Sequence, residues 1–151
     1  MQTIASFTVD HTVLEPGMYV SRIDGDITTY DLRTRKPNAG DYMDEETMHS
    51  VEHMLATLLR NGPLGAQILY FGPMGCATGF YLLVRDADNA RVLAVLKEAL
   101  ADTVAFGGEI YGCSARECGN YRTLNLAKAK KEAARTLKTL ENIDGSMQYV
   151  A

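Results

Sequence analysis

The sequence predicts an α+β fold, an α/β sandwich in which helices pack against an antiparallel β-sheet, formed as a single domain by residues 1–151. Short runs of alternating apolar and polar residues fill the first third, and three later stretches place apolar residues at helical spacing. Strand-like and helical stretches do not alternate regularly, as they would in the βαβ units of a parallel sheet. A chain of 151 residues can bury a core of its own without disulfides or a structural metal.

The first third of the chain, residues 4–34, is predicted to form strands joined by turns. Alternation of apolar and polar residues is typical of strands that bury one face. The alternation is interrupted at Pro16-Gly17 and Asp24-Gly25, where turns are expected. The expected strand segments are 6–9, 18–20 and 27–32.

Residues 44–61 are predicted to form a helix. Acidic residues in the first turn suit the positive end of the helix dipole, and Gly62-Pro63 ends the run. Apolar residues recur at a spacing that would place them on one helix face. They are Met48, Val51, Leu55, Leu58 and Leu59.

Two further strands are expected after this helix, at 67–71 and 78–84. The glycine- and proline-containing stretch 72–76 separates them, so Cys76 would lie on a turn between strands. Most of the remainder is predicted to form two more helices, at 90–104 and 124–140. An irregular, glycine-rich segment, 106–119, lies between them.

Charge and composition favour a small-molecule ligand. The formal net charge of −4 does not favour nucleic acid or an anionic membrane surface as a partner. No stretch approaches the roughly 18 apolar residues that span a bilayer, and no basic segment followed by an apolar run opens the chain, so a cytoplasmic protein is expected. The 3 cysteines form an odd and sparse set, which suits thiols that act as ligands or reactive groups.

The run His49-Ser50-Val51-Glu52-His53 has the spacing of a metal site. Two histidines four residues apart lie about one helical turn apart, so both imidazoles can reach one ion. Glu52 directly precedes the second histidine, where a carboxylate can act as a general base, as in the H-x-x-E-H pattern of inverted zinc peptidases. The alternative is a histidine pair on a helix surface beside a solvated glutamate.

Two histidines leave the site incomplete, and a thiolate is the expected third ligand. Spacing alone does not choose between Cys113 and Cys118, although a glycine follows Cys118 and would let the backbone approach an ion closely. Two rival interpretations stay open at this point. One is an inverted zinc peptidase, and the other is a non-enzymatic domain in which both histidines and both cysteines close a structural Cys2His2 zinc site.

Five separated blocks of the sequence resemble the S-ribosylhomocysteine lyase (LuxS) family, whose members form the precursor of autoinducer-2. The blocks follow one another in the expected order and cover nearly the whole chain. They are Ser6-Phe7-Thr8-Val9-Asp10-His11-Thr12, Tyr30-Asp31-Leu32-Arg33 with Pro37-Asn38, His49-Ser50-Val51-Glu52-His53, Pro73-Met74-Gly75-Cys76-Ala77-Thr78-Gly79, and Glu117-Cys118-Gly119-Asn120-Tyr121-Arg122.

The resemblance implies one catalytic divalent metal ion per chain, held by His49, His53 and Cys118 with an open fourth position. It implies Fe(II) as the native ion, with Zn(II) or Co(II) in many isolated proteins. Glu52 and Cys76 match the family's acid/base pair. The residues implied to line the substrate pocket are Ser6, His11 and Arg33. The resemblance further implies a homodimer whose active sites lie at the interface.

The implied reaction splits the thioether of S-ribosylhomocysteine into homocysteine and 4,5-dihydroxy-2,3-pentanedione. The carbonyl of the opened sugar must first migrate along the chain, after which homocysteine leaves by β-elimination. A metal can polarise the sugar oxygens, while Cys76 and Glu52 transfer protons. Arg33 would suit the carboxylate of the homocysteine end. Without the resemblance, Cys76 would be taken for a small buried apolar residue, and His11 for an ordinary polar residue at a strand end.

The sequence departs from the family pattern at three places. Gly17-Met18 are additional residues, Tyr70-Phe71-Gly72 stands where the family usually has Asp-Ile-Ser, and Thr123-Leu124-Asn125 stands where Asp-His-Asp is common. None of these positions is a proposed ligand or proton-transfer residue. We therefore expect them to affect substrate affinity or specificity more than the class of reaction.

Overall fold

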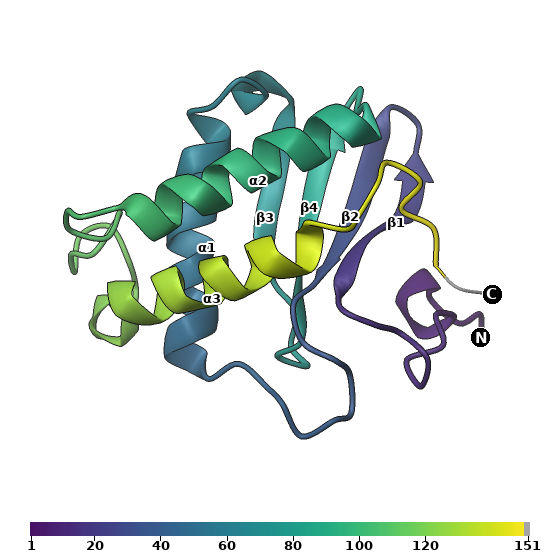
Figure 1. The fold of residues 1–151 in the computed structure, drawn as a ribbon, viewed down its shortest axis with the longest axis horizontal. Coiled ribbons are helices and arrows are strands. Elements are labelled where there is room, and N and C mark those ends of the chain that lie inside the picture. Colours follow the sequence, from purple (N-terminus) through teal and green to yellow (C-terminus); the bar gives the residue numbers. More distant parts are fainter. Residues whose placement is uncertain (150–151) are drawn as a thin grey trace.

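The computed structural model describes residues 1–149. Four antiparallel strands form one sheet in the order β1-β2-β4-β3, and three helices cover one of its faces (Figure 1). This arrangement confirms the predicted α+β class. The strands are β1 (Gly17–Asp24), β2 (Ile27–Arg33), β3 (Ile68–Pro73) and β4 (Gly79–Arg85). The helices are α1 (Glu45–Arg60), α2 (Asn89–Ala105) and α3 (Leu126–Leu140).

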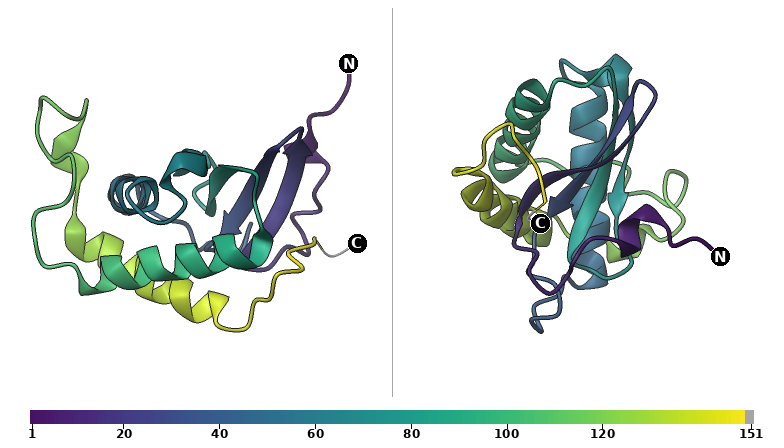
Figure 2. Two further views of the ribbon diagram at one scale, coloured as in Figure 1. Left: turned by 90° about the horizontal axis from the view of Figure 1, so that it is seen from above. Right: turned by 90° about the vertical axis from the view of Figure 1, so that its right-hand side faces the viewer.

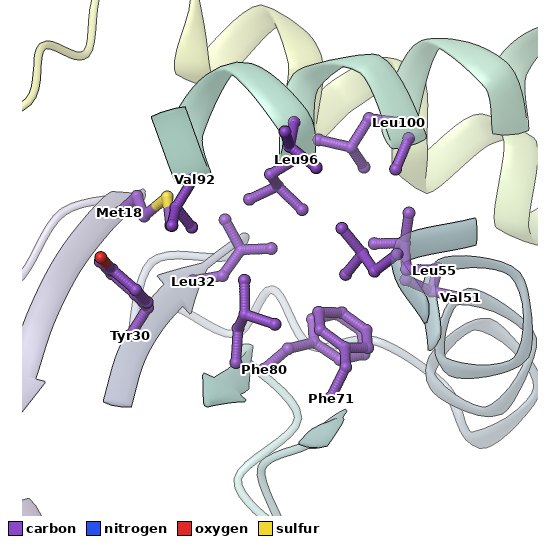
Figure 3. Close-up of a cluster of buried hydrophobic side chains, with 14 of the residues drawn as sticks. Met18, Tyr30, Leu32, Val51, Leu55, Phe71, Phe80, Val92, Leu96 and Leu100 are labelled. Carbon is purple, nitrogen blue, oxygen red and sulfur yellow. The ribbon is translucent and has the colours of Figure 1, made fainter. Parts of the chain in front are cut away.

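The hydrophobic core fills the space between the sheet and the helices. In β2 and β4 the pairs Tyr30↔Leu82 and Leu32↔Phe80 point into this space, because alternate side chains of a strand share one face. Figure 3 shows the sheet residues meeting apolar side chains from α1 and α2. Full burial of each large apolar side chain stabilises the fold by about 1.5–3 kcal/mol. The helix residues labelled there are Val51, Leu55, Val92, Leu96 and Leu100.

Helix α1 forms where it was predicted, and both of its ends have local causes. The Asp44 side chain caps the first turn by accepting a hydrogen bond from the Thr47 N–H at 2.7 Å. At the other end the Asn61 N–H bonds back to the Thr57 carbonyl at 3.1 Å, and Gly62-Pro63 follows. The apolar face of the helix is buried against the core, which leaves His49 and His53 only partly covered.

Two sequence-based expectations need correction. Residues 6–9 were predicted to form a strand, whereas Ala5–Phe7 is a short 3₁₀ helix followed by a turn. The Thr8 hydroxyl and N–H both bond back to the Ala5 carbonyl, at 2.7 and 3.1 Å, and such local bonds compete with strand pairing. The last helix begins at Leu126 and not at residue 124, because Asn125 caps it by accepting from the Lys128 N–H.

The second face of the sheet carries no long helix within residues 1–149. Figure 2 shows the helices gathered on one side, with the N-terminal 3₁₀ helix near the opposite face. Several large apolar side chains in this region are exposed, among them Phe7 at 74% and Tyr70 at 46%. No helix in the described part of the chain has the length and apolar character that crossing a membrane requires.

Candidate active site

A group of three side chains from two distant segments has the geometry of a metal site. His49 and His53 come from adjacent turns of α1, and Cys118 comes from the irregular segment before α3. Their ligand atoms all lie within 4.8 Å of one another, and the Cys118 Sγ is 3.4 Å from the His49 Nε2. The structure therefore brings together the three residues that were expected to bind a metal.

Hydrogen bonds engage the Nδ1 atom of each imidazole, so the Nε2 atoms are the ones that an ion could bind. The His53 Nδ1 lies 2.8 Å from the Tyr111 carbonyl oxygen and must donate to it. The His49 Nδ1 lies 2.5 Å from the Thr123 hydroxyl, whose own hydrogen points to the Asn120 carbonyl at 3.0 Å. Thr123 therefore accepts from His49. Histidine ligands are commonly oriented in this way by a partner at the second nitrogen.

The electrostatics of the group also suit a metal ligand. Burial lowers the pKa of His49, and the neighbouring His53 lowers it further, against smaller opposing effects of Glu52 and Glu45. A lowered pKa favours the neutral imidazole, which is the form that coordinates a cation. Two nitrogens and a thiolate form a donor set that suits Fe(II), Co(II) or Zn(II).

The segment that carries Cys118 is held by its own hydrogen bonds. The Glu117 and Cys118 N–H groups both donate to the Ser114 carbonyl, at 3.1 and 3.0 Å. The Asn120 N–H donates to the Cys118 sulfur at 3.4 Å. Gly112 has a φ of +70°, and an added Cβ there would come within 3.0 Å of the His53 Nδ1. Glycine is therefore needed where this segment passes the imidazole.

Cys113 lies outside the metal group. Its side chain is partly buried and packs against the hydrophobic core. In the described residues the group consists of His49, His53 and Cys118 alone. The structural Cys2His2 site is therefore not supported. Glu52 lies beside the group, in a hollow of about 500 Å³ whose lining also includes His53, Tyr111 and Glu117.

Cys76 lies on the turn between β3 and β4, as predicted, and its side chain is exposed. The interpretation of Cys76 as a buried apolar residue is therefore wrong. Its sulfur is 3.0 Å from the Thr78 hydroxyl and 3.8 Å from the Arg33 Nη1. Cys76 and Thr78 line a hollow of about 330 Å³, together with His11, Pro37, Asn38 and Tyr42.

Arg33 lies under this thiol and is only 3% exposed. Its Nε and Nη2 donate to the two carboxylate oxygens of Asp31 at 3.1 and 2.6 Å, and its Nη1 donates to Thr78 at 2.9 Å. Burial lowers the pKa of Arg33, but the hydrogen bond and charge of Asp31 raise it above its usual value. The bidentate edge of the guanidinium is occupied by Asp31, which leaves Nη1 directed at the thiol.

Comparison with known proteins decides the family of this chain. The family model described as S-Ribosylhomocysteinase (LuxS) matches residues 4–146. The chain belongs to this family. A relative from Clostridium acetobutylicum is 44% identical over 149 residues, covering 95% of this chain and 94% of the relative. Relatives from Borreliella burgdorferi (43% identical, 95% of both chains) and Desulfotalea psychrophila (45% identical, 95% and 94%) are similar. All three are named S-ribosylhomocysteine lyase.

Family membership confirms the resemblance found in the five sequence blocks and leaves the inverted zinc peptidase without support. Five of the predicted site residues of this LuxS chain line three separate hollows, whereas Arg33, His49 and Cys118 line none of the three. Glu52 adjoins the metal group, His11 shares a hollow with Cys76, and Ser6 lines a third hollow of about 380 Å³ on the open sheet face. No residue lines more than one of these three hollows.

Two departures from the LuxS pattern have structural consequences. Tyr70 lies on the open face of the sheet, and a Cβ on Gly72 would overlap its ring, so the two substitutions depend on each other. Thr123 directly contacts His49, one of the proposed ligands. Thr123 was not among the predicted site residues. The only feature of the sequence that pointed to it is that threonine replaces the aspartate common in the family.

Proposed function

We propose that this chain is a metal-dependent lyase that cleaves the thioether of S-ribosylhomocysteine to homocysteine and 4,5-dihydroxy-2,3-pentanedione. The family match over residues 4–146 and the names of the relatives support the reaction. The observation that carries the proposal is the convergence of His49, His53 and Cys118, with ligand atoms within 4.8 Å. A closed structural site would need a fourth protein ligand, and this group has three.

The metal in the cell is proposed to be one Fe(II) per chain, with Zn(II) or Co(II) able to replace it. The two imidazole nitrogens and the thiolate would hold the ion. When bound, it supplies Lewis-acid polarisation of the sugar oxygens, which makes the neighbouring C–H groups more acidic. A cytoplasmic location suits this donor set, because a reducing compartment keeps the cysteines as thiols.

Cys76 is proposed to move the protons between sugar carbons. Its exposed position on a turn lets the sulfur reach a bound substrate, and Arg33 places a positive charge 3.8 Å from it. Ser6 and His11 are proposed to contact the substrate. Arg33 would contact it through Nη1 or act through the thiol.

Glu52 is proposed to be the second proton-transfer residue. It lines the hollow beside the metal group, where a carboxylate can take a proton from a sugar hydroxyl or from the carbon adjacent to the carbonyl before elimination. The final step breaks the bond between carbon and sulfur, and homocysteine leaves with its thiol protonated. Cys76 and Glu52 thus have separate tasks in one reaction.

A homodimer is proposed to complete the active site. Within one chain, the hollow that contains Glu52 and the hollow that contains Cys76 share no lining residue. The open face of the sheet exposes Phe7 and Tyr70, and such apolar side chains suit an interface. We infer that the metal group of one protomer faces the Cys76 hollow of its partner.

Release of free thiol from S-ribosylhomocysteine by the Fe(II)-loaded protein tests the reaction. Cys76→Ala and Glu52→Gln should each retain the metal and the fold but lose thiol release by several orders of magnitude, because each removes a proton-transfer group. Carbon-13 NMR of labelled substrate should show that Glu52→Gln accumulates a ketose which Cys76→Ala does not form. Turnover of both variants at the wild-type rate would contradict the assignment.

A further inference from the structure

The chain after α3 returns across the edge strand β1. Figure 1 shows this last segment, in yellow, passing from the end of α3 beside β2 and β1. The Val20 N–H donates to the Met147 carbonyl at 2.7 Å. The Tyr149 ring stacks on Tyr19, with ring centroids 4.9 Å apart and planes inclined by 15°. Backbone and aromatic contacts therefore fix the position of Tyr149.

The Tyr149 hydroxyl donates to the Asp31 Oδ2 at 2.7 Å. Asp31 is 1% exposed, so its carboxylate depends on protein donors. Burial raises the pKa of Tyr149, and the negative charge of Asp31 raises it further. The hydroxyl therefore stays protonated and remains a donor at neutral pH.

From Asp31 the contacts continue to the thiol of Cys76. The same Oδ2 atom accepts from the Arg33 Nη2 at 2.6 Å, and the Arg33 Nη1 lies 3.8 Å from the Cys76 sulfur. Thr78 supports this end by accepting from Nη1 at 2.9 Å. A side chain at the end of the chain is thus linked through two buried charges to the proposed base.

We propose that Tyr149 is a positioning residue for Cys76. The proposal rests on the function proposed above for that thiol. Asp31 and Cys76 compete for the positive charge of Arg33. The Tyr149 hydroxyl donates to Asp31 and so offsets part of the negative charge of the carboxylate. The positive charge of Arg33 then interacts more strongly with the Cys76 sulfur. Without that donor, the carboxylate draws Arg33 more strongly, and the guanidinium is held less favourably for its contact with the Cys76 sulfur.

Within the described part of the chain, other groups near the thiol have no hydrogen bond to Tyr149. His11 and Tyr42 line the Cys76 hollow, and Tyr81 is near enough to Asp31 and Cys76 that both raise its pKa, after the larger effect of burial. None of these side chains shares a hydrogen bond with Tyr149 in residues 1–149. A change at the Tyr149 hydroxyl therefore reports on the path through Asp31 and Arg33.

Tyr149→Phe tests the proposal, with Tyr19→Phe as its matched control. Both substitutions remove one hydroxyl from the same aromatic stack, but the Tyr19 hydroxyl donates to the Glu15 carbonyl and not to Asp31. The rate at which iodoacetamide alkylates Cys76 at pH 7, read by peptide mass mapping, should fall about three- to tenfold in Tyr149→Phe. The value of kcat should fall by a similar factor with KM unchanged.

In Tyr19→Phe, both quantities should stay within about twofold of wild type. Equal Cys76 alkylation rates in the two variants would overturn the proposal, even if Tyr149→Phe lowered the melting temperature, because that result would show a structural role only. The alkylation measurement needs no turnover. If the wild-type protein released no thiol, the lyase function would fail while the link from Tyr149 to Cys76 could still be judged.

Discussion

At the scale of single residues, the metal group depends on partners that were not apparent in the motifs. His53 is oriented by a backbone carbonyl, and His49 by the hydroxyl of Thr123. Thr123 lies five positions after Cys118, so one short segment supplies both a proposed ligand and the orienting partner of another. A neutral hydroxyl at this place makes the imidazole a weaker donor to the metal than a carboxylate would.

Thr123→Val should lower the affinity for the metal about 10- to 100-fold, because valine keeps the shape of the side chain but cannot accept from the His49 Nδ1. Competition between the protein and a chelator for Co(II) measures this change. Thr123→Ser, which keeps a hydroxyl, should bind the ion nearly as well as wild type. Equal affinities of the valine and serine variants would exclude an orienting role for the hydroxyl.

The ligand set itself can be tested by metal content. Cys118→Ala should lose the ion from the purified protein, because it removes one of three ligands. Cys113→Ser should retain it, since Cys113 packs against the core and lies outside the group. Elemental analysis of both proteins measures the difference. Equal loss of metal from the two variants would instead support the closed four-ligand site.

At the scale of elements, ion pairs attach the loops near the site to α3. Arg35 forms a bidentate pair with the buried Glu132 on α3 and a second pair with Asp41. These contacts hold the loop from residue 34 to 43, which contributes Pro37 and Asn38 to the Cys76 hollow. Two basic side chains of α3 are also paired within the protein, Lys128 with Asp44 and Arg135 with Asp41.

The start of α1 depends on the Asp44 cap. Its pKa is lowered to about 2, first by the hydrogen bond from Lys128 and then by those from Thr47. Because the folded pKa lies below the unfolded one, this stabilisation is present above about pH 4 and is lost as the pH falls toward 2. Asp44→Ala should therefore lower the free energy of unfolding by about 1 kcal/mol at pH 7.

Denaturant unfolding at a series of pH values measures this effect. The difference between wild type and Asp44→Ala should shrink as the pH is lowered from 4 to 2. Asp88 is a matched control, because it occupies the N-cap of α2 but its side chain forms no capping bond. Asp88→Ala should change stability by less than about 0.5 kcal/mol. If Asp88→Ala lost as much stability as Asp44→Ala, the capping hydrogen bond would not be the cause of the Asp44 effect.

At the scale of the whole molecule, the proposed homodimer would make assembly part of the chemistry, because Glu52 and Cys76 line separate hollows within one chain. Mixed dimers of Cys76→Ala and Glu52→Gln chains test this. In a shared site, each mixed dimer contains one intact and one doubly altered site, so random mixing should restore about a quarter of the wild-type rate. Thiol release after joint refolding measures this recovery. Sites contained within one chain would show none.

The sequence by itself predicted the fold class, α1 and the histidine pair, because these depend on local periodicity and on residue types at close spacing. The resemblance of five sequence blocks supplied the family and Cys118 as the third proposed ligand. The sequence misplaced residues 6–9, where local hydrogen bonds outweigh a strand-like pattern. Only the tertiary structure decided that Arg33 is held by Asp31, that Thr123 orients His49 and that Tyr149 reaches Asp31. Asp31 and Tyr149 are 118 positions apart in the sequence, and no local pattern records a contact that exists only after the sheet and the C-terminal segment have packed together.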